Sequence, residues 1–168
     1  AMQPELAPTG EQPAPQRFGA KDVMDLSWKN LMDAYSCTEC GRCSAACPAN
    51  QTGKLLSPRK IMMDTRDRLE EVGKNINVNK EFKDDSRSLL HDYISVEELR
   101  ACTTCNACVQ ECPVSISPLD IIIQLRRYLV MEESNSPQEW AGMFSNVENN
   151  FAPWKFSPDE RDKWVEEV

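Results

Sequence analysis

The stretch C-T-E-C-G-R-C-S-A-A-C-P, residues 37–48, decides the fold, because its pattern returns as C-T-T-C-N-A-C-V-Q-E-C-P at residues 102–113. Every cysteine of the first copy recurs sixty-five positions later, and a proline follows the fourth cysteine of each copy. The chain therefore carries two copies of one cysteine run, and together they use all eight of its cysteines: Cys37, Cys40, Cys43 and Cys47, then Cys102, Cys105, Cys108 and Cys112.

The spacing of these cysteines indicates iron–sulfur ligands. Thiolates suit iron–sulfur clusters, zinc and copper(I), and C-x2-C-x2-C-x3-C-P is the run that binds [4Fe–4S] clusters in two-cluster proteins. There, three cysteines of a run hold one cluster and the fourth reaches the other. We therefore predict two [4Fe–4S] clusters with crossed ligands: Cys37, Cys40, Cys43 and Cys112 for one, and Cys102, Cys105, Cys108 and Cys47 for the other.

Other uses of the eight cysteines fit the sequence less well. Structural zinc sites usually take paired C-x2-C knuckles rather than a triplet with a distant fourth ligand. A disulfide framework is typical of short secreted chains, whereas this chain has 168 residues and shows no signal peptide. A purely structural role for the clusters, without electron transfer, stays open.

The residues between the cysteines agree with loops that curl around a cluster. Gly41 and Asn106 follow the second cysteine of each copy, and these residue types enter the left-handed backbone region most easily. Arg42 lies between two predicted ligands, where its charge either pairs with a partner's carboxylate or offsets the cluster. The sequence does not separate these two roles.

The composition describes an acidic protein with one domain of ordinary size. Its formal net charge of −8 disfavours binding to nucleic acid through phosphates, and no apolar run approaches the ~20 residues of a membrane span. We predict a cytoplasmic protein, or one held at the inner face of the membrane by a partner or an N-terminal anchor. The expected organisation is a proline-rich disordered linker or tail over residues 1–20, a dicluster domain over 21–133 and a helical C-terminal extension over 134–168.

Helix signals dominate the rest of the chain, so we predict an all-α fold with two cysteine loops between helices. Ser-Pro pairs at residues 57, 117, 136 and 157, and Ser95 with Glu98, are N-cap signals. Gly73 is expected to end the helix that starts near Pro58, and residues 74–93 are expected to form a loop with room for a short strand. Apolar stripes at helical spacing complete the pattern: Met24, Trp28, Leu31, Met32 and Tyr35 in one, and Trp140, Met143, Phe144 and Val147 in another.

The two cysteine segments, residues 35–67 and 99–130, resemble those of the electron-transferring C subunit of heterodisulfide reductase and related iron–sulfur oxidoreductase modules. The resemblance implies the α-helical ferredoxin fold with two [4Fe–4S] clusters. In larger relatives, the segment similar to residues 143–164 leads into a domain with a Cys-Cys-Gly motif. Because this chain has no adjacent cysteine pair, the resemblance implies a non-catalytic electron-transfer part of a larger complex.

The function expected from the sequence is therefore the relay of single electrons within a heterodisulfide-reductase-like oxidoreductase. The partners implied are a Cys-Cys-Gly reductase polypeptide or domain, and a membrane cytochrome b-like or flavoprotein electron partner. One alternative is an iron–sulfur fragment of a quinone-linked dehydrogenase of the succinate, fumarate or glycerol-3-phosphate type. Another is a non-redox scaffold with structural clusters.

Overall fold

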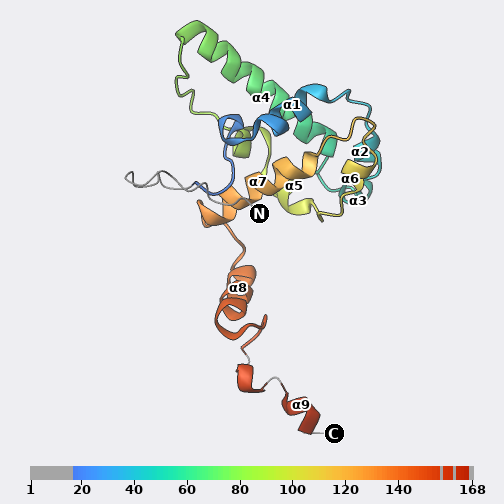
Figure 1. The fold of residues 1–168 in the computed structure, drawn as a ribbon, viewed down its shortest axis with the longest axis vertical. Coiled ribbons are helices and arrows are strands. Elements are labelled where there is room, and N and C mark those ends of the chain that lie inside the picture. The colour runs from blue at the N-terminus through green and yellow to red at the C-terminus, as the bar shows by residue number, and fades with distance from the viewer. Residues whose placement is uncertain (1–16, 156, 161, 167–168) are drawn as a thin grey trace, which may run out of the picture. The chain divides into compact units, whose positions relative to one another are not determined.

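The computed structural model describes residues 17–155, 157–160 and 162–166, and most of the predicted linker of residues 1–20 lies outside them. The described ranges contain helices and no β-strand, which confirms the predicted all-α class. The chain divides after Glu132 into two compact units, the first of which carries all the cysteines. Figure 1 labels the helices of the first unit, which are α1 (Trp28–Ser36), α2 (Arg42–Ala45), α3 (Pro48–Gln51), α4 (Pro58–Asn79), α5 (Val96–Ala101), α6 (Ala107–Gln110) and α7 (Pro118–Met131), with a 3-10 turn η1 at Val23–Asp25.

Serine caps start α4, α5 and α7, as predicted. The hydroxyl of Ser57 accepts from the backbone N–H of Lys60 at the start of α4, and Ser117 accepts from Asp120 at the start of α7. A complete capping box precedes α5, because the side chain of Glu98 also accepts from the backbone N–H of Ser95. These bonds satisfy N–H groups that have no partner within the helix.

Gly73 does not end α4, so that prediction was wrong. The helix continues for six residues to Asn79 and ends at Lys80, which takes the left-handed conformation and donates its N–H to the carbonyl of Ile76. The apolar stripe explains the extension, because Val72, just before the glycine, is buried, and Ile76, three residues after it, packs against the core. A buried stripe supplies more stabilisation than the ~1 kcal/mol that one glycine costs a helix.

The rest of the predicted loop, beyond α4, contains no strand. It ends in a tight turn, η2 (Leu89–Tyr93), in which the N–H of Ile94 donates to the carbonyl of Leu89 and His91 has a φ of 80°. Leu89, Leu90 and Ile94 are fully buried, so this turn is an anchor of the core.

The core of the first unit lies where α4 and α7 cross, with α1 packed on α4. Arg68 of α4 is fully buried there and is held by ion pairs with Asp22 (2.7 Å) and Asp85 (2.6 Å). These two carboxylates raise the pKa of Arg68, so the residue stays charged. Its bonds join the N-terminal segment, α4 and the loop after it, and the apolar members of this core include Ile61, Met62, Ile121, Ile122, Leu125 and Leu129.

The residues next to the predicted domain boundary at residue 20 pack against α7. Ala20 is fully buried, and its N–H donates to the carbonyl of Gln124 in α7 at 3.0 Å. Gly19 has a φ of 74°, and a Cβ at this position would lie 2.4 Å from the same carbonyl oxygen. Only glycine fits this close approach of the backbone to α7.

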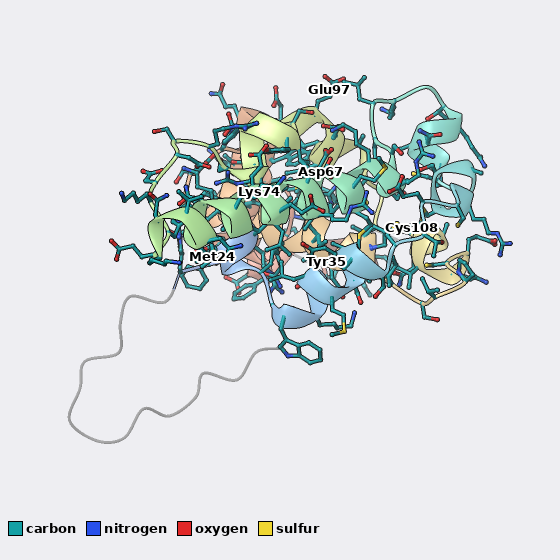
Figure 2. All side chains as sticks on the ribbon, turned by 90° about the horizontal axis from the view of Figure 1, so that it is seen from above. Met24, Tyr35, Asp67, Lys74, Glu97 and Cys108 are labelled. Atoms are coloured by element: carbon teal, nitrogen blue, oxygen red, sulfur yellow. The ribbon has the colours of Figure 1, made fainter. Side chains whose placement is uncertain are left out.

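Two predicted apolar stripes lie largely on the surface of their own units, although Leu31 of the first stripe packs against the core. On η1 and α1, Met24 and Tyr35 are exposed, as Figure 2 shows, and so are Trp28 and Met32. In the second unit, α8 (Gln138–Asn150) is helical as predicted, but its N-cap is Pro137, without a side-chain bond, so the predicted cap at Ser136 was wrong. Its stripe of Trp140, Met143, Phe144 and Val147 is at least 40% exposed at every position.

The second unit contains two further short helices after α8. Phe151 ends α8 in the left-handed conformation, and the side chain of Asn146 donates to the carbonyl of Pro153. A 3-10 turn, η3 (Pro158–Glu160), follows, with Ser157 accepting from the N–H of Asp159, and then α9 (Lys163–Glu166). None of the described helices is long and apolar enough to cross a membrane.

Candidate iron–sulfur site

The two cysteine runs fold alike, and their short helices α2, α3 and α6 gather at one end of the first unit (Figure 1). α2 spans Arg42–Ala45 and α6 spans Ala107–Gln110, which are the same positions of the two copies. In both copies the first cysteine ends a helix, α1 before Cys37 and α5 before Cys102. The sequence duplication is thus a duplication of structure.

Left-handed residues bend both loops. Gly41 (φ 81°) and Asn106 (φ 65°) form the turns that precede α2 and α6, as predicted. Glu39 and Thr104 also have a φ of 57°, which their residue types did not indicate. The bend turns backbone N–H groups toward the cysteines, and that of Thr104 donates to the Sγ atom of Cys102 at 3.4 Å.

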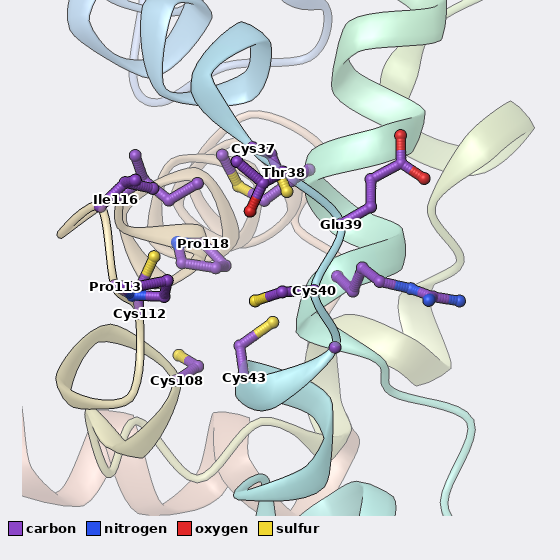
Figure 3. A pocket seen from close by; sticks show the side chains of 14 residues that line it. Cys37, Thr38, Glu39, Cys40, Cys43, Cys108, Cys112, Pro113, Ile116 and Pro118 are labelled. Carbon is purple, nitrogen blue, oxygen red and sulfur yellow. The ribbon is translucent and has the colours of Figure 1, made fainter.

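A first hollow opens between the first loop and the end of the second. Figure 3 shows Cys37, Cys40, Cys43, Cys108 and Cys112 around this common space. Its walls are completed by residues of the two long helices and the segment before α7, namely Arg59, Met62, Ile116 and Pro118. The hollow holds about 360 Å³ of space free of atoms, part of it open to solvent.

A second hollow of similar size, about 310 Å³, opens between the second loop and the end of the first. Four cysteines line it: Cys47, Cys102, Cys105 and Cys108. Its other walls repeat those of the first hollow, because Leu56, Pro58, Leu119 and Ile122 stand at the positions that match Ile116, Pro118, Arg59 and Met62 when the two Ser-Pro helix starts are aligned. Cys108 lines both hollows, so the two lie side by side.

Exposure and acidity differ along each cysteine run. Cys40 and Cys105 are exposed, whereas Cys108 is buried. Burial raises the pKa of Cys108 to about 11 and also raises that of Cys43. The backbone N–H of Ala107, which donates to Cys105, lowers the pKa of that thiol. Because ligand cysteines bind as thiolates, loading the site releases protons.

Two arginines that the sequence analysis missed hold the loops. Arg66 of α4 forms an ion pair with Glu39, which raises the pKa of Arg66. Arg126 of α7 donates to the carbonyls of Leu99 and Cys102. Both arginines stand nine residues after the serine cap of their helix, so an alignment of the two Ser-Pro helices would have found them.

The donor set fits [4Fe–4S] clusters. Each hollow is lined by thiols, the ligands that such clusters take. Among the described residues, no three His, Cys, Asp or Glu side chains stand close enough to hold a single metal ion. The sulfurs of a four-cysteine zinc site lie about 3.8 Å apart, whereas a cluster between the thiolates spreads them further.

Comparison with known proteins agrees with this chemistry. Residues 36–116 match the model of the 4Fe-4S dicluster domain. The chain is 33% identical to the probable iron-sulfur-binding oxidoreductase FadF of Bacillus subtilis and to the EtfAB:quinone oxidoreductase of Syntrophomonas wolfei. The matches cover 91% and 90% of this chain but 26% and 24% of those proteins, so the chain spans about a quarter of their length.

A third relative is closer to this chain in size. The C subunit of the ferredoxin/F(420)H(2)-dependent CoB-CoM heterodisulfide reductase of Methanosarcina acetivorans is 34% identical over 71% of this chain and 60% of its own length. All of these relatives are named as oxidoreductases or their subunits. Residues 36–116 are therefore a 4Fe–4S dicluster domain with an all-helical, ferredoxin-like fold, and the chain is an electron-transfer module that holds two [4Fe–4S] clusters.

Proposed function

We propose that this chain relays single electrons between two partners in a larger oxidoreductase, through two clusters with crossed ligands. The observation that carries the proposal is the pair of adjoining hollows. Cys112 lines the hollow of the first loop and Cys47 that of the second, which supports the assignment of Cys37, Cys40, Cys43 and Cys112 to one cluster and of Cys102, Cys105, Cys108 and Cys47 to the other.

A bound [4Fe–4S] cluster accepts and gives one electron at a time. The chain's own residues supply the conditions for relay rather than for substrate chemistry. Four thiolates assigned to each cluster leave no iron of a cubane without a protein ligand, and the exposed cysteines, Cys40 and Cys105, bring one edge of each site to the surface. We place the catalytic centre on a partner.

The relatives' names supply the candidates for these partners. A heterodisulfide-reductase-like assembly with a Cys-Cys-Gly polypeptide follows the sequence resemblance and the match to the heterodisulfide reductase of Methanosarcina acetivorans. A quinone-linked electron pathway, fed by a flavoprotein, is the second candidate. The length of the match supports this second candidate, because the match to the EtfAB:quinone oxidoreductase extends over 90% of this chain, against 71% for the heterodisulfide reductase.

Anaerobic purification followed by metal and sulfide analysis tests the relay directly. We expect about eight iron and eight sulfide ions per chain, and one-electron reduction of each cluster in a redox titration followed by EPR. Zinc without sulfide, or clusters that stay silent on reduction, would rule the relay out. Anaerobic affinity purification from the source cells tests the partners, because the first candidate requires a co-purifying polypeptide with adjacent cysteines.

A further inference from the structure

We call the surface around the opening of each hollow its mouth. The two mouths are alike in backbone but differ in charge. Arg42 on α2 is matched by Ala107 on α6, and Arg59 on α4 by Leu119 on α7. Glu111 is exposed next to Cys112, which lines the first hollow, so one carboxylate also stands near the first mouth. Arg42 and Arg59 still leave the first mouth with a positive balance, whereas the matched positions of the second copy are uncharged.

The two arginines of the first mouth are available to a partner. Both are exposed, and Arg59 lines the same hollow as the cysteines of the first loop. Among the described residues, no carboxylate is recorded in an ion pair with Arg42 or Arg59. The one acidic residue of this loop, Glu39, is already paired with Arg66.

No charged side chain is among the described residues that line the second hollow, whereas Arg59 lines the first. Arg126, the equivalent of Arg66, is partly buried, and its guanidinium is directed to the carbonyls of Leu99 and Cys102. A cluster adds about −2 to both mouths alike, so the difference between them remains when the sites are loaded.

The edge of the first mouth also carries apolar residues, Pro113 and Val114, which we call the Val114 lip. Val114 is 45% exposed and lines the first hollow together with Pro113, beside the exposed Cys40. Apolar contacts rimmed by charge, next to an exposed ligand of the cluster, are suited to a transient protein complex whose orientation is set by electrostatics.

We propose that the mouth of the first hollow, marked by Arg42, Arg59 and the Val114 lip, is the docking surface for a redox partner with an acidic face. The proposal rests on the relay function and adds to it the chemistry of one partner and the cluster that this partner meets. The cations stand out because the chain as a whole carries −8, or about −12 with two clusters. Without a local positive surface, an acidic partner would be repelled.

Two small oxidants of opposite charge test the proposal on the cluster-loaded protein. Hexacyanoferrate(III) and hexaammineruthenium(III) each take one electron from the dithionite-reduced protein and become the iron(II) and ruthenium(II) complexes. With the oxidant limiting, stopped-flow rates are measured from about 0.02 M to about 0.3 M salt, a range over which exposed charges become screened. We expect the rate with the anion to fall as salt rises, although the net charge of the protein alone predicts a rise.

The variant Arg42→Ala/Arg59→Leu gives the first mouth the residues of the second. We expect it to react about tenfold more slowly with hexacyanoferrate(III) at low salt, with the salt dependence reversed. The matched control, Lys74→Ala/Lys83→Ala, removes the same charge elsewhere: Lys74 lies away from Cys108 in Figure 2, and the backbone of Lys83 bonds Asn75, the next residue of α4. This control should stay within about twofold of the wild type. Arg42→Gln/Arg59→Gln should repeat the effect of the first variant, because charge rather than side-chain shape is the cause.

Poly-L-glutamate serves as an acidic macromolecular probe. At low salt it should slow hydrogen exchange in residues 40–44 of the wild type, but not in the Arg42→Gln/Arg59→Gln protein. A rate with hexacyanoferrate(III) that rises with salt, or an arginine variant that behaves like the lysine control, overturns the docking surface and leaves the relay standing. Clusters that give up no electron to either oxidant overturn the relay itself, and the docking surface with it.

Discussion

The two halves of the dicluster domain share their loops but not the segments that follow them. Both loops have a left-handed turn, a four-residue helix and a fourth cysteine at the same spacing. After Cys47, the first half inserts α3 before Ser57, whereas the second half reaches Ser117 within five residues of Cys112. The long helices also differ, with 22 residues in α4 and 14 in α7.

This difference shows where cluster chemistry constrains the chain and where it does not. Four thiolates around a cube fix the loop and the first turns of the helix that covers it. Beyond those turns, each helix is positioned by its own packing contacts. In α4 these centre on Arg68, which is fully buried, and in α7 the equivalent residue is Tyr128, which packs at the surface against Arg17.

The largest expected effect is a difference in stability between variants at these two equivalent positions, Arg68 and Tyr128. Arg68→Met leaves the carboxylates of Asp22 and Asp85 without their cation, so we expect a loss of about 3 to 5 kcal/mol in the free energy of unfolding. Tyr128→Phe, the matched change in the second half, removes one long contact with Arg17 and should cost under about 0.5 kcal/mol. Denaturation of the loaded protein, followed by circular dichroism, measures both. Equal losses would show that the halves are anchored alike.

The next prediction compares cysteines within the second loop and across the halves. After removal of the clusters and reduction of any disulfide, iodoacetamide at pH ~8 should label Cys105 at least about 100-fold faster than Cys108. The reason is that Cys105 has a lowered pKa, whereas that of Cys108 is raised to about 11. Cys43 of the first loop, whose pKa burial also raises, should react more slowly than Cys105. Labelling of Cys108 should increase as the pH approaches 11, and mass spectrometry of the peptides follows each site.

Sequence reasoning found the caps, the loops and the eight thiols because each depends on local residue chemistry. Ser57, Ser117 and the Ser95–Glu98 box were recognisable from short-range patterns. The end of α4 was not, because burial of Val72 and Ile76 outweighed the glycine signal at Gly73. Pairing of Arg66 with Glu39 was also out of reach, since it depends on how α4 crosses the first loop.

The apolar stripes show a second limit. Helical spacing correctly predicted α1 and α8, but the stripe residues Trp28 and Trp140 are exposed in their own units. Periodicity gives the face of a helix and does not say what covers it. The assignment of ligands to clusters likewise rests on spacing and on the lining of the hollows, and it stays a prediction.

A smaller effect tests the claim that the halves share their helix starts. Ser57→Ala and Ser117→Ala each remove one cap bond to a backbone N–H. Each should lower the free energy of unfolding by about 1 kcal/mol. Ser57 also bonds Ser44 of α2 through its hydroxyl at 2.8 Å, so the first-half variant should show the larger loss by a few tenths of a kcal/mol. Thermal unfolding of the two variants, side by side, is the measurement.

The smallest effect comes from exchanging the loop residues themselves. Gly41→Asn gives the first loop the left-handed residue of the second, and a Cβ at Gly41 meets nothing within 4 Å. We expect a change in stability below about 1 kcal/mol and unchanged iron content. Gly41→Val is the contrasting variant, because a β-branched residue does not tolerate this conformation. Loss of iron from the asparagine variant would mean that the two loops are not equivalent.

The most direct test of the interlocked arrangement is EPR spectroscopy of three reduced single variants, Cys47→Ser, Cys40→Ser and Cys105→Ser, together with their iron content. Crossed ligation predicts that Cys47→Ser perturbs the same cluster signal as Cys105→Ser and leaves the signal affected by Cys40→Ser intact. If Cys47→Ser instead alters the signal that Cys40→Ser alters, each cysteine run holds its own cluster and the crossed account is contradicted.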